Sequence, residues 1–193
     1  MKIRPLTLAF LIFATGAATC GGIDRIRIRE TATAEIPPST LLENLVGDLG
    51  FSQFATLDLS QNQELQNQGI EKHQIDHVYL QELALQITAP PSGQDFTFID
   101  RLEFFVESDG LPTELLAAGG PFAADLTAVN LDVEDVDLAP YVTAPSMAIT
   151  TQVQGRRPRE RTTIEASLRF QVDVNVGGLV CGGGKDEATD GGA

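Results

Sequence analysis

The segment 162–176, TTIEASLRFQVDVNV, alternates apolar and polar residues along its length. Its apolar members share one face of an extended chain: Ile164, Ala166, Leu168, Phe170, Val172, Val174 and Val176. Polar residues occupy the positions between them. Because successive side chains of a β-strand point to opposite faces, this pattern predicts one long strand with a buried face and a solvent-exposed face.

Shorter stretches of the chain show the same two-residue period. They lie at 26–28, 51–59, 83–87, 102–106, 113–118, 129–133 and 147–153. Turn-forming sequences rich in Gly and Pro separate several of them, at 89–93, 108–112, 118–121 and 154–158. About seven to eight strands with one-sided burial predict an all-β fold, an antiparallel β-sandwich of the immunoglobulin-like or a similar type. A closed β-barrel is the alternative that the pattern leaves open.

One segment, 37–50, has a helical rather than an extended period. Within PPSTLLENLVGDLG, Thr40 and Glu43 match a capping box, and Gly50 is suited to end a helix. Its apolar side chains recur on one helical face: Leu41, Leu42, Leu45, Val46 and Leu49. We therefore expect one short helix here, covering one open end of the β structure.

The first 19 residues have the layout of an export signal. Lys2 and Arg4 supply a positive start, 6–14 is apolar, and the small residues 16–18 follow. The apolar run is far shorter than the ~20 residues of a membrane-spanning helix. We therefore expect an exported protein.

Residues 17–20, AATC, resemble the lipobox of bacterial lipoproteins, in which the cysteine becomes the lipidated first residue. That family usually has Leu where Ala17 stands and Gly or Ala where Thr19 stands. The two glycines after Cys20 would make a flexible tether. We favour lipidation of Cys20, which would hold the protein on a membrane, over cleavage to a soluble secreted protein that begins at Thr19.

These features divide the chain into four parts. They are a signal peptide (1–19), a lipid-anchor cysteine with its glycine tether (20–22), a β-sandwich domain (23–176) and a disordered tail rich in Gly and Asp (177–193). The second cysteine, Cys181, lies in the tail. If Cys20 is not acylated, a secreted soluble module closed by a Cys20–Cys181 disulfide is the alternative.

The composition excludes some classes of partner. The 193 residues carry a net charge of −14, and loss of Lys2 and Arg4 with the signal makes the protein more acidic. Such a chain is a poor nucleic-acid binder, because the phosphate backbone selects clustered Lys and Arg. Anionic lipid would repel it, so a covalent anchor is the more consistent membrane attachment.

His73 and His77 are the two histidines, and Glu71 and Asp76 lie beside them. With these acids they suggest a metal-dependent hydrolase as an alternative function. A catalytic zinc usually takes three protein ligands and a water molecule. Only two imidazoles are present, so we prefer the interpretation that these are surface histidines at the start of a strand.

The acidic segment 131–140, LDVEDVDLAP, contains weak candidate ligands for calcium: Asp132, Glu134, Asp135 and Asp137. Calcium takes about six to eight oxygens, often from a loop bent at a glycine, and this segment has no glycine. We therefore expect a solvated strand end, no bound metal and no cofactor.

Alternating arginines mark the start of the predicted domain. Arg25, Arg27 and Arg29 lie between isoleucines and form a ladder on one strand face. If the first strand pairs beside the last, Glu165 and Asp173 can face this ladder and neutralise it. We prefer that structural role to an anion-binding one.

A second group of arginines lies in the predicted loop GRRPRER, 155–161. Its members are Arg156, Arg157, Arg159 and Arg161. Guanidinium groups match the geometry of carboxylates and phosphates, so this exposed loop is our candidate contact for an anion or a partner.

Patterns of known enzymes are absent from the sequence. There is no G-x-S-x-G elbow and no phosphate-cradling glycine loop. The segments 98–112 (FIDRLEFFVESDGLP), 136–142 (VDLAPYV) and 162–176 resemble parts of uncharacterised bacterial lipoproteins with a β-sandwich domain. The likeness covers about the last two-thirds of the chain and concerns strand pattern, so it implies a fold and a location but no site residues.

Together these observations predict a non-enzymatic binding or structural module of a bacterial cell envelope. It would be attached to a membrane, such as the outer membrane, through Cys20, on the periplasmic face or the cell surface. Its ligand does not follow from the sequence.

Overall fold

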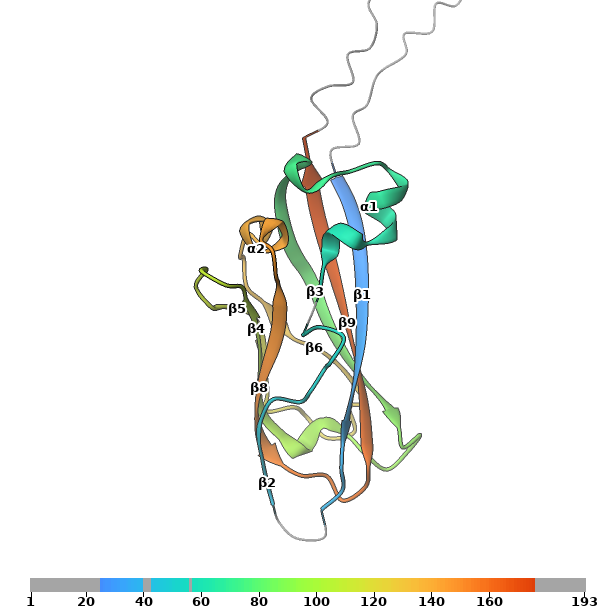
Figure 1. Ribbon diagram of the computed structural model, residues 1–193. Coiled ribbons are helices and arrows are strands. Elements are labelled where there is room, and N and C mark those ends of the chain that lie inside the picture. The colour runs from blue at the N-terminus through green and yellow to red at the C-terminus, as the bar shows by residue number, and fades with distance from the viewer. Residues whose placement is uncertain (1–24, 40–42, 56, 176–193) are drawn as a thin grey trace, which may run out of the picture.

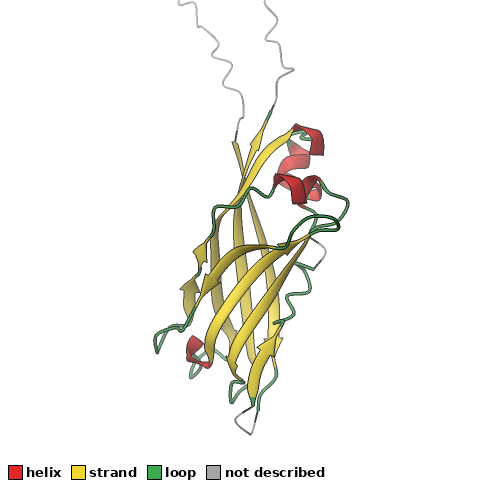
Figure 2. Cartoon of the chain, turned by 90° about the vertical axis from the view of Figure 1, so that its left-hand side faces the viewer, coloured by secondary structure: helices red, strands yellow, loops and turns green. Residues whose placement is uncertain are grey.

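The computed structural model describes residues 25–39, 43–55 and 57–175 (Figure 1). Within these residues, nine strands form two antiparallel sheets that pack face to face (Figure 2). The predicted antiparallel β-sandwich is confirmed. The described strands form two separate sheets rather than one closed sheet, so the barrel alternative is wrong.

The first sheet has four strands and the second has five. In order across the first sheet they are β1 (Arg25–Ile36), β9 (Thr162–Val174), β3 (Ile75–Ala89) and β6 (Ala128–Asn130). In order across the second they are β2 (Asn44–Gly47), β8 (Ala148–Arg156), β4 (Ile99–Glu107), β5 (Glu114–Gly119) and β7 (Asp132–Val133).

Short helical elements connect the strands. They are the 3₁₀ turns η1 (Leu59–Gln61), η2 (Lys72–Gln74) and η3 (Phe96–Phe98), and the α-helices α1 (Gln63–Asn67) and α2 (Ala139–Thr143).

Strand β9 follows the alternation that the sequence predicts. Its even-numbered residues from Thr162 to Val174 are buried, and its odd-numbered residues are partly exposed. Phe170 is fully buried between the sheets, as is Phe104 of β4 in the facing sheet. Burial of these apolar faces is the main force that holds a sandwich together.

Strand β1 pairs with β9 along its whole length, so the first strand lies beside the last as expected. Arg25 is opposite Asp173 at one end of the pair, and Ile36 is opposite Thr162 at the other. We call the end with Arg25 and Asp173 the terminal pole, and the end with Ile36 and Thr162 the distal pole. Figure 1 shows that β1 begins and β9 ends at the terminal pole.

The predicted helix at 37–50 is wrong for the residues that the structure describes. Asn44–Gly47 form β2, an edge strand that pairs with β8. Leu45 is buried, whereas Val46 is 75% exposed, so the apolar stripe does not face one side. Pairing with β8 satisfies backbone groups of this edge and outweighs the local helical pattern.

Three further expectations were wrong in detail. The described residues of 51–59 form no strand: Phe51 and Phe54 are buried on either side of a turn, and Leu59 starts η1. The expected strand at 129–133 is divided at Leu131 between β6 of one sheet and β7 of the other. Gly155 belongs to β8 rather than to a turn.

Several predictions lie outside the described residues. They are the signal peptide, Cys20 with its tether, the segment 40–42 of the expected helix, and the tail with Cys181. Within the part of the chain that the structure describes, no helix has the length and hydropathy needed to cross a membrane.

Candidate functional site

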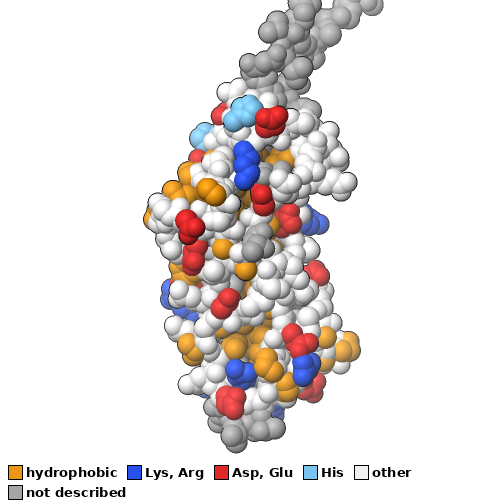
Figure 3. Space-filling view, viewed as in Figure 1, with side chains coloured by type: hydrophobic (Ala, Val, Ile, Leu, Met, Phe, Trp, Pro, Cys, Tyr) orange, Lys and Arg blue, Asp and Glu red, His pale blue; other side chains and the backbone are white. Residues whose placement is uncertain are grey.

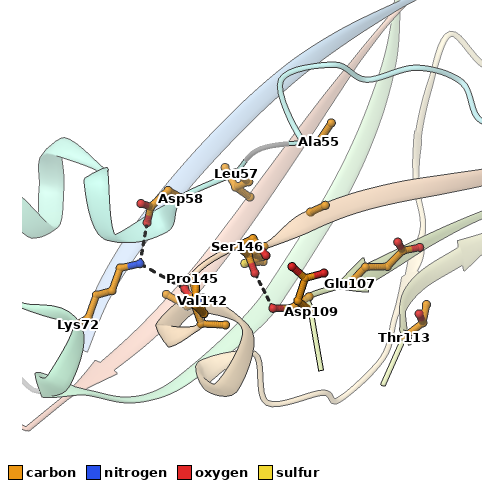
Figure 4. Close-up of a pocket in the computed structure, with 14 residues that line it drawn as sticks. Ala55, Leu57, Asp58, Lys72, Glu107, Asp109, Thr113, Val142, Pro145 and Ser146 are labelled. Carbon is orange, nitrogen blue, oxygen red and sulfur yellow. Dashed lines mark hydrogen bonds and ion pairs between the residues drawn. The ribbon is translucent and has the colours of Figure 1, made fainter. Parts of the chain in front are cut away.

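A pocket of about 410 Å³ opens beside α2, toward the terminal pole (Figure 4). Four separate segments line it: the turn before η1, the start of η2, the end of β4 with the turn after it, and the stretch from α2 into β8. Its lining residues are Ala55, Leu57, Asp58, Lys72, Glu107, Ser108, Asp109, Thr113, Val142, Ala144, Pro145, Ser146, Met147 and Ala148.

Lys72 connects two of these segments across the pocket. Its Nζ lies 3.6 Å from Asp58 Oδ1 and 3.5 Å from the carbonyl oxygen of Ala144. On the other side, the hydroxyl of Ser108 donates to the carbonyl oxygen of Ser146 at 2.5 Å. Figure 4 shows these contacts at the two sides of the opening.

The lining combines an apolar part with an acidic rim. Leu57, Val142 and Met147 are buried side chains, whereas Glu107 and Asp109 are exposed carboxylates. With Asp58 and Lys72, the lining holds three carboxylates and one ammonium group. This balance suits a small neutral or cationic molecule with an apolar part better than an anion.

The two histidines contact different carboxylates. His73 Nδ1 lies 3.3 Å from Glu71 Oε2, and His77 Nδ1 lies 2.7 Å from Asp137 Oδ2. No three His, Cys, Asp or Glu residues among those described are grouped so that they could hold a metal ion. Figure 3 shows the histidine side chains near the terminal pole.

Asp137, one of the calcium candidates, contacts His77, one of the two candidate histidines. Besides His77, it accepts hydrogen bonds from the amides of Val78, at 3.1 Å, and Ala139, at 3.0 Å, through Oδ1. It therefore ties β3 to the start of α2.

The other three acids of the calcium candidate lie on the surface. Asp132, Glu134 and Asp135 are exposed, and Asp132 is part of the two-residue strand β7. Of the four carboxylates, that of Asp137 is the one with hydrogen bonds to other described residues.

The arginine loop at 155–161 is partly neutralised. Arg157 Nε lies 3.6 Å from Glu43 Oε2, and Arg161 forms an ion pair with Glu35 of β1. Arg156 ends β8 rather than lying in the loop as expected. Arg156 and Arg159 are exposed and have no ion pair within the described residues. The loop lies at the distal pole, since Thr162 directly follows it.

Counting only partners that the structure describes, the arginine ladder of β1 is neutralised at one position. Arg25 Nε lies 3.1 Å from Asp173 Oδ1, as the sequence suggested. Arg27 is opposite Gln171, and Arg29 is opposite Arg169 rather than an acid. Glu165, the other expected partner, is opposite Thr33 and is therefore too far along the strand.

Sequence reasoning did not identify the pocket. Its lining comes from segments as far apart as Ala55 and Ala148, and no local pattern connects them. It also overlooked Arg169, although this residue lies on the polar face of the best-defined strand. A register for β1 and β9 would have placed Arg169 beside the ladder.

Comparison with protein-family models finds no match, and comparison with curated proteins finds no similar sequence. One similar solved structure is described as the 60-mer BFDV capsid protein. It is 10% identical, the match covers 78% of this chain and 93% of that chain, and the TM-score is 0.42. A likeness at this level carries no information about function.

Proposed function

We propose that this chain is an exported, lipid-anchored protein of the bacterial cell envelope whose β-sandwich acts as a non-enzymatic binding module. The sequence supports the anchor through an export-signal pattern that ends at Cys20. The main structural observation in support of the proposal is that the start of β1 and the end of β9 lie side by side at the terminal pole, where Arg25 contacts Asp173.

This arrangement gives an anchor at Cys20 a defined geometric consequence. Arg25 opens β1, and the five residue steps back to Cys20 can span at most about 18 Å. The terminal pole would therefore face the membrane. The distal pole, with Arg156 at the end of β8 and Arg159 in the loop that follows, would face away from it.

The pocket beside α2 supports a binding role. It combines buried apolar side chains with a small number of charged groups, which is common in sites for small molecules. His77 and Asp137 are explained by their structural contacts, so nothing in this region requires a catalytic role.

The anchor is tested on the full-length chain expressed in a bacterium. We expect the mature protein to begin at Cys20, to carry the added mass of lipid and to sediment with membranes. Cys20→Ala should release it in soluble form, whereas Cys181→Ala should leave it on the membrane. A soluble wild-type protein that begins at Thr19 would contradict the proposal.

The same preparation tests the disulfide alternative, which the neighbouring ends of β1 and β9 also favour. A Cys20–Cys181 disulfide would change the electrophoretic mobility on reduction, and Cys181→Ala would abolish that change. A lipidated Cys20 excludes this result, because an acylated thiol cannot form a disulfide.

Binding in the pocket is tested by native mass spectrometry of protein released gently from membranes. Ala55→Trp places a large side chain at the mouth of the pocket, and Gln152→Trp, exposed on β8 away from the lining, is the matched control. We expect a co-released small molecule with wild type and with the control, and its loss with Ala55→Trp. Equal retention by both variants would exclude this pocket as the site.

A further inference from the structure

Three arginines meet on the outer face of the first sheet. Arg27 and Arg29 of β1 and Arg169 of β9 alternate with buried residues of their strands, so their side chains leave the same face. We call them the arginine triad. Arg29 and Arg169 are directly opposite in the antiparallel register. At such positions the Cβ atoms lie about 4.5–5.5 Å apart, and like charges destabilise the pair.

The protein neutralises only part of this charge. Arg169 forms an ion pair with Glu82 of β3. Arg27 and Arg29 have neither an ion pair nor a side-chain hydrogen bond within the described residues. Asp173, also on this face, already accepts from Arg25 and from the amide of Gln171. The triad therefore keeps a net positive charge on an acidic chain.

A surface depression of about 240 Å³ lies within this face, bounded by Arg27, Gln81, Arg169 and Gln171. Gln81 is exposed where the register of β3 shifts between Leu80 and Glu82. The depression exceeds several-fold the ~30 Å³ that one water molecule occupies. It crosses three strands, because Arg27 belongs to β1 and Gln81 to β3, on either side of β9.

We infer that the arginine triad and Gln81 form a binding site for a phosphate group. Guanidinium groups bind phosphate through parallel N–H donors, and two of the three have no acid to occupy them. The peripheral oxygens of a phosphate can accept from β1 and β9 at the same time, which would relieve the repulsion between Arg29 and Arg169. The inference does not depend on the anchor at Cys20.

Two sources of phosphate fit this chemistry, a soluble phosphorylated molecule and a phospholipid headgroup. The triad lies toward the terminal pole, two to four residues along β1 from Arg25, so a headgroup is within reach if the chain is anchored. The shared ligand is the phosphate group itself, and the experiment below separates the sources.

The test uses the full-length chain with Cys20→Ala, so that no lipid anchor contributes. Inorganic pyrophosphate is titrated at low ionic strength, and binding is followed by calorimetry and by the arginine Nε–Hε signals in ¹H–¹⁵N spectra. We expect Arg27→Gln and Arg29→Gln each to weaken binding at least tenfold. Arg101→Gln, which removes an exposed arginine paired with Glu103 on β4, should change it less than twofold.

Arg29→Lys separates the effect of guanidinium geometry from that of charge, because lysine keeps the positive charge but lacks the planar arrangement of N–H donors. We expect weaker binding than wild type, and this variant also serves if Arg29→Gln fails to fold. The inference is overturned if pyrophosphate leaves the Arg27 and Arg29 signals unchanged, or if Arg101→Gln weakens binding as much as Arg29→Gln does. It is also overturned if only substitutions at Arg156 and Arg159 abolish binding.

Binding to lipid vesicles then identifies the source of the phosphate group. Co-sedimentation with phosphatidylcholine vesicles that contain phosphatidic acid, reversed by pyrophosphate and absent with pure phosphatidylcholine, supports a lipid headgroup at this site. Binding of pyrophosphate without co-sedimentation supports a soluble phosphorylated ligand. Co-sedimentation that persists in Arg27→Gln and Arg29→Gln contradicts a headgroup at the triad.

Discussion

His77 Nδ1 on β3 lies 2.7 Å from Asp137 Oδ2, just before α2, and this contact joins two parts of the chain that are 60 residues apart. The hydrogen bond to Asp137 raises the pKa of His77 above 6.5 against an opposing effect of burial, and Asp76 and Asp173 act in the same direction as Asp137. Burial acts to raise the pKa of Asp137, but hydrogen bonds from His77, Ala139 and Val78 hold it below 3.8.

The first prediction concerns pH. Protonated His77 stabilises the fold fully below pH 6.5, and this contribution is lost as the pH rises through the raised pKa. Ionised Asp137 contributes above pH 3.8, and this is lost as the pH falls through the lowered pKa. We therefore expect the melting temperature of wild type to exceed that of Asp137→Asn most clearly between these values.

Asp137→Asn also allows a direct measurement of the His77–Asp137 interaction through the pKa of His77. Asp137→Asn keeps an acceptor for the amides of Val78 and Ala139 but removes the charge beside the imidazole. In an NMR titration, the pKa of His77 should fall toward 6.5 in Asp137→Asn and stay raised in Asp135→Asn. A wild-type imidazole that titrates at or below 6.5 would show that the pair does not form.

The second prediction tests the core at β9. Phe170 is fully buried on the central strand of the β1–β9–β3 group. Phe170→Ala should lower the free energy of unfolding by ~3–5 kcal/mol, because it removes buried apolar surface and leaves a cavity. Ser167→Ala, on the polar face of the same strand, should change it by less than ~0.5 kcal/mol. Denaturant unfolding measures both, and a loss well under 1 kcal/mol for Phe170→Ala would contradict its burial.

The long strands could be predicted from sequence because their period reports burial directly. In β9, every second residue faces the opposite sheet, so the pattern and the structure have the same cause. The prediction failed for β2, where four residues at a sheet edge carry too little periodicity to compete with a helical pattern around them. There, pairing with β8 determines the conformation. Such pairing joins residues that are far apart in the sequence, so a short stretch of sequence does not reveal it.

The candidate sites were less predictable, because they depend on register. The arginine ladder was visible in the sequence, but whether each arginine meets an acid depends on its partner in β9. Arg25 meets Asp173, whereas Arg29 meets Arg169. A register shifted by two residues would have placed Arg27 opposite Asp173 or Arg169 and left Arg25 and Arg29 opposite neutral residues. The pocket beside α2 depends on four distant segments and could not be inferred from any one of them.

The third prediction concerns Gly155, which the sequence places in a turn and the structure places in β8. A Cβ at this position would clash with the carbonyl oxygen of Phe98, the last residue of η3, and would lie 3.0 Å from the Cα of Ile99, where β4 begins. Gly155→Ala should therefore destabilise the protein by ~1–3 kcal/mol, because the backbone at Phe98 and Ile99 has to move. Gln154→Ala, exposed beside it, is the control. If chemical denaturation finds Gly155→Ala as stable as wild type, β4 and β8 do not approach in this way.

The fourth prediction is that removing one member of the arginine triad stabilises the fold. Arg29 is exposed and faces Arg169, so Arg29→Gln removes a like-charge contact without exposing core. We expect the melting temperature to rise by roughly 1–3 °C at low ionic strength, and the gain to shrink in salt as the repulsion is screened. Thr31→Gln, opposite the neutral Ser167, should show no such salt-dependent gain.

Arg169→Gln distinguishes repulsion from a general effect of charge. This substitution removes the same contact with Arg29 but also leaves Glu82 without its partner, so its gain should be smaller than that of Arg29→Gln. A lower melting temperature for Arg29→Gln would show that Arg29 stabilises the strand pair. A higher melting temperature for Arg29→Gln, together with weaker pyrophosphate binding, is the result that we expect if Arg29 serves binding and lowers stability.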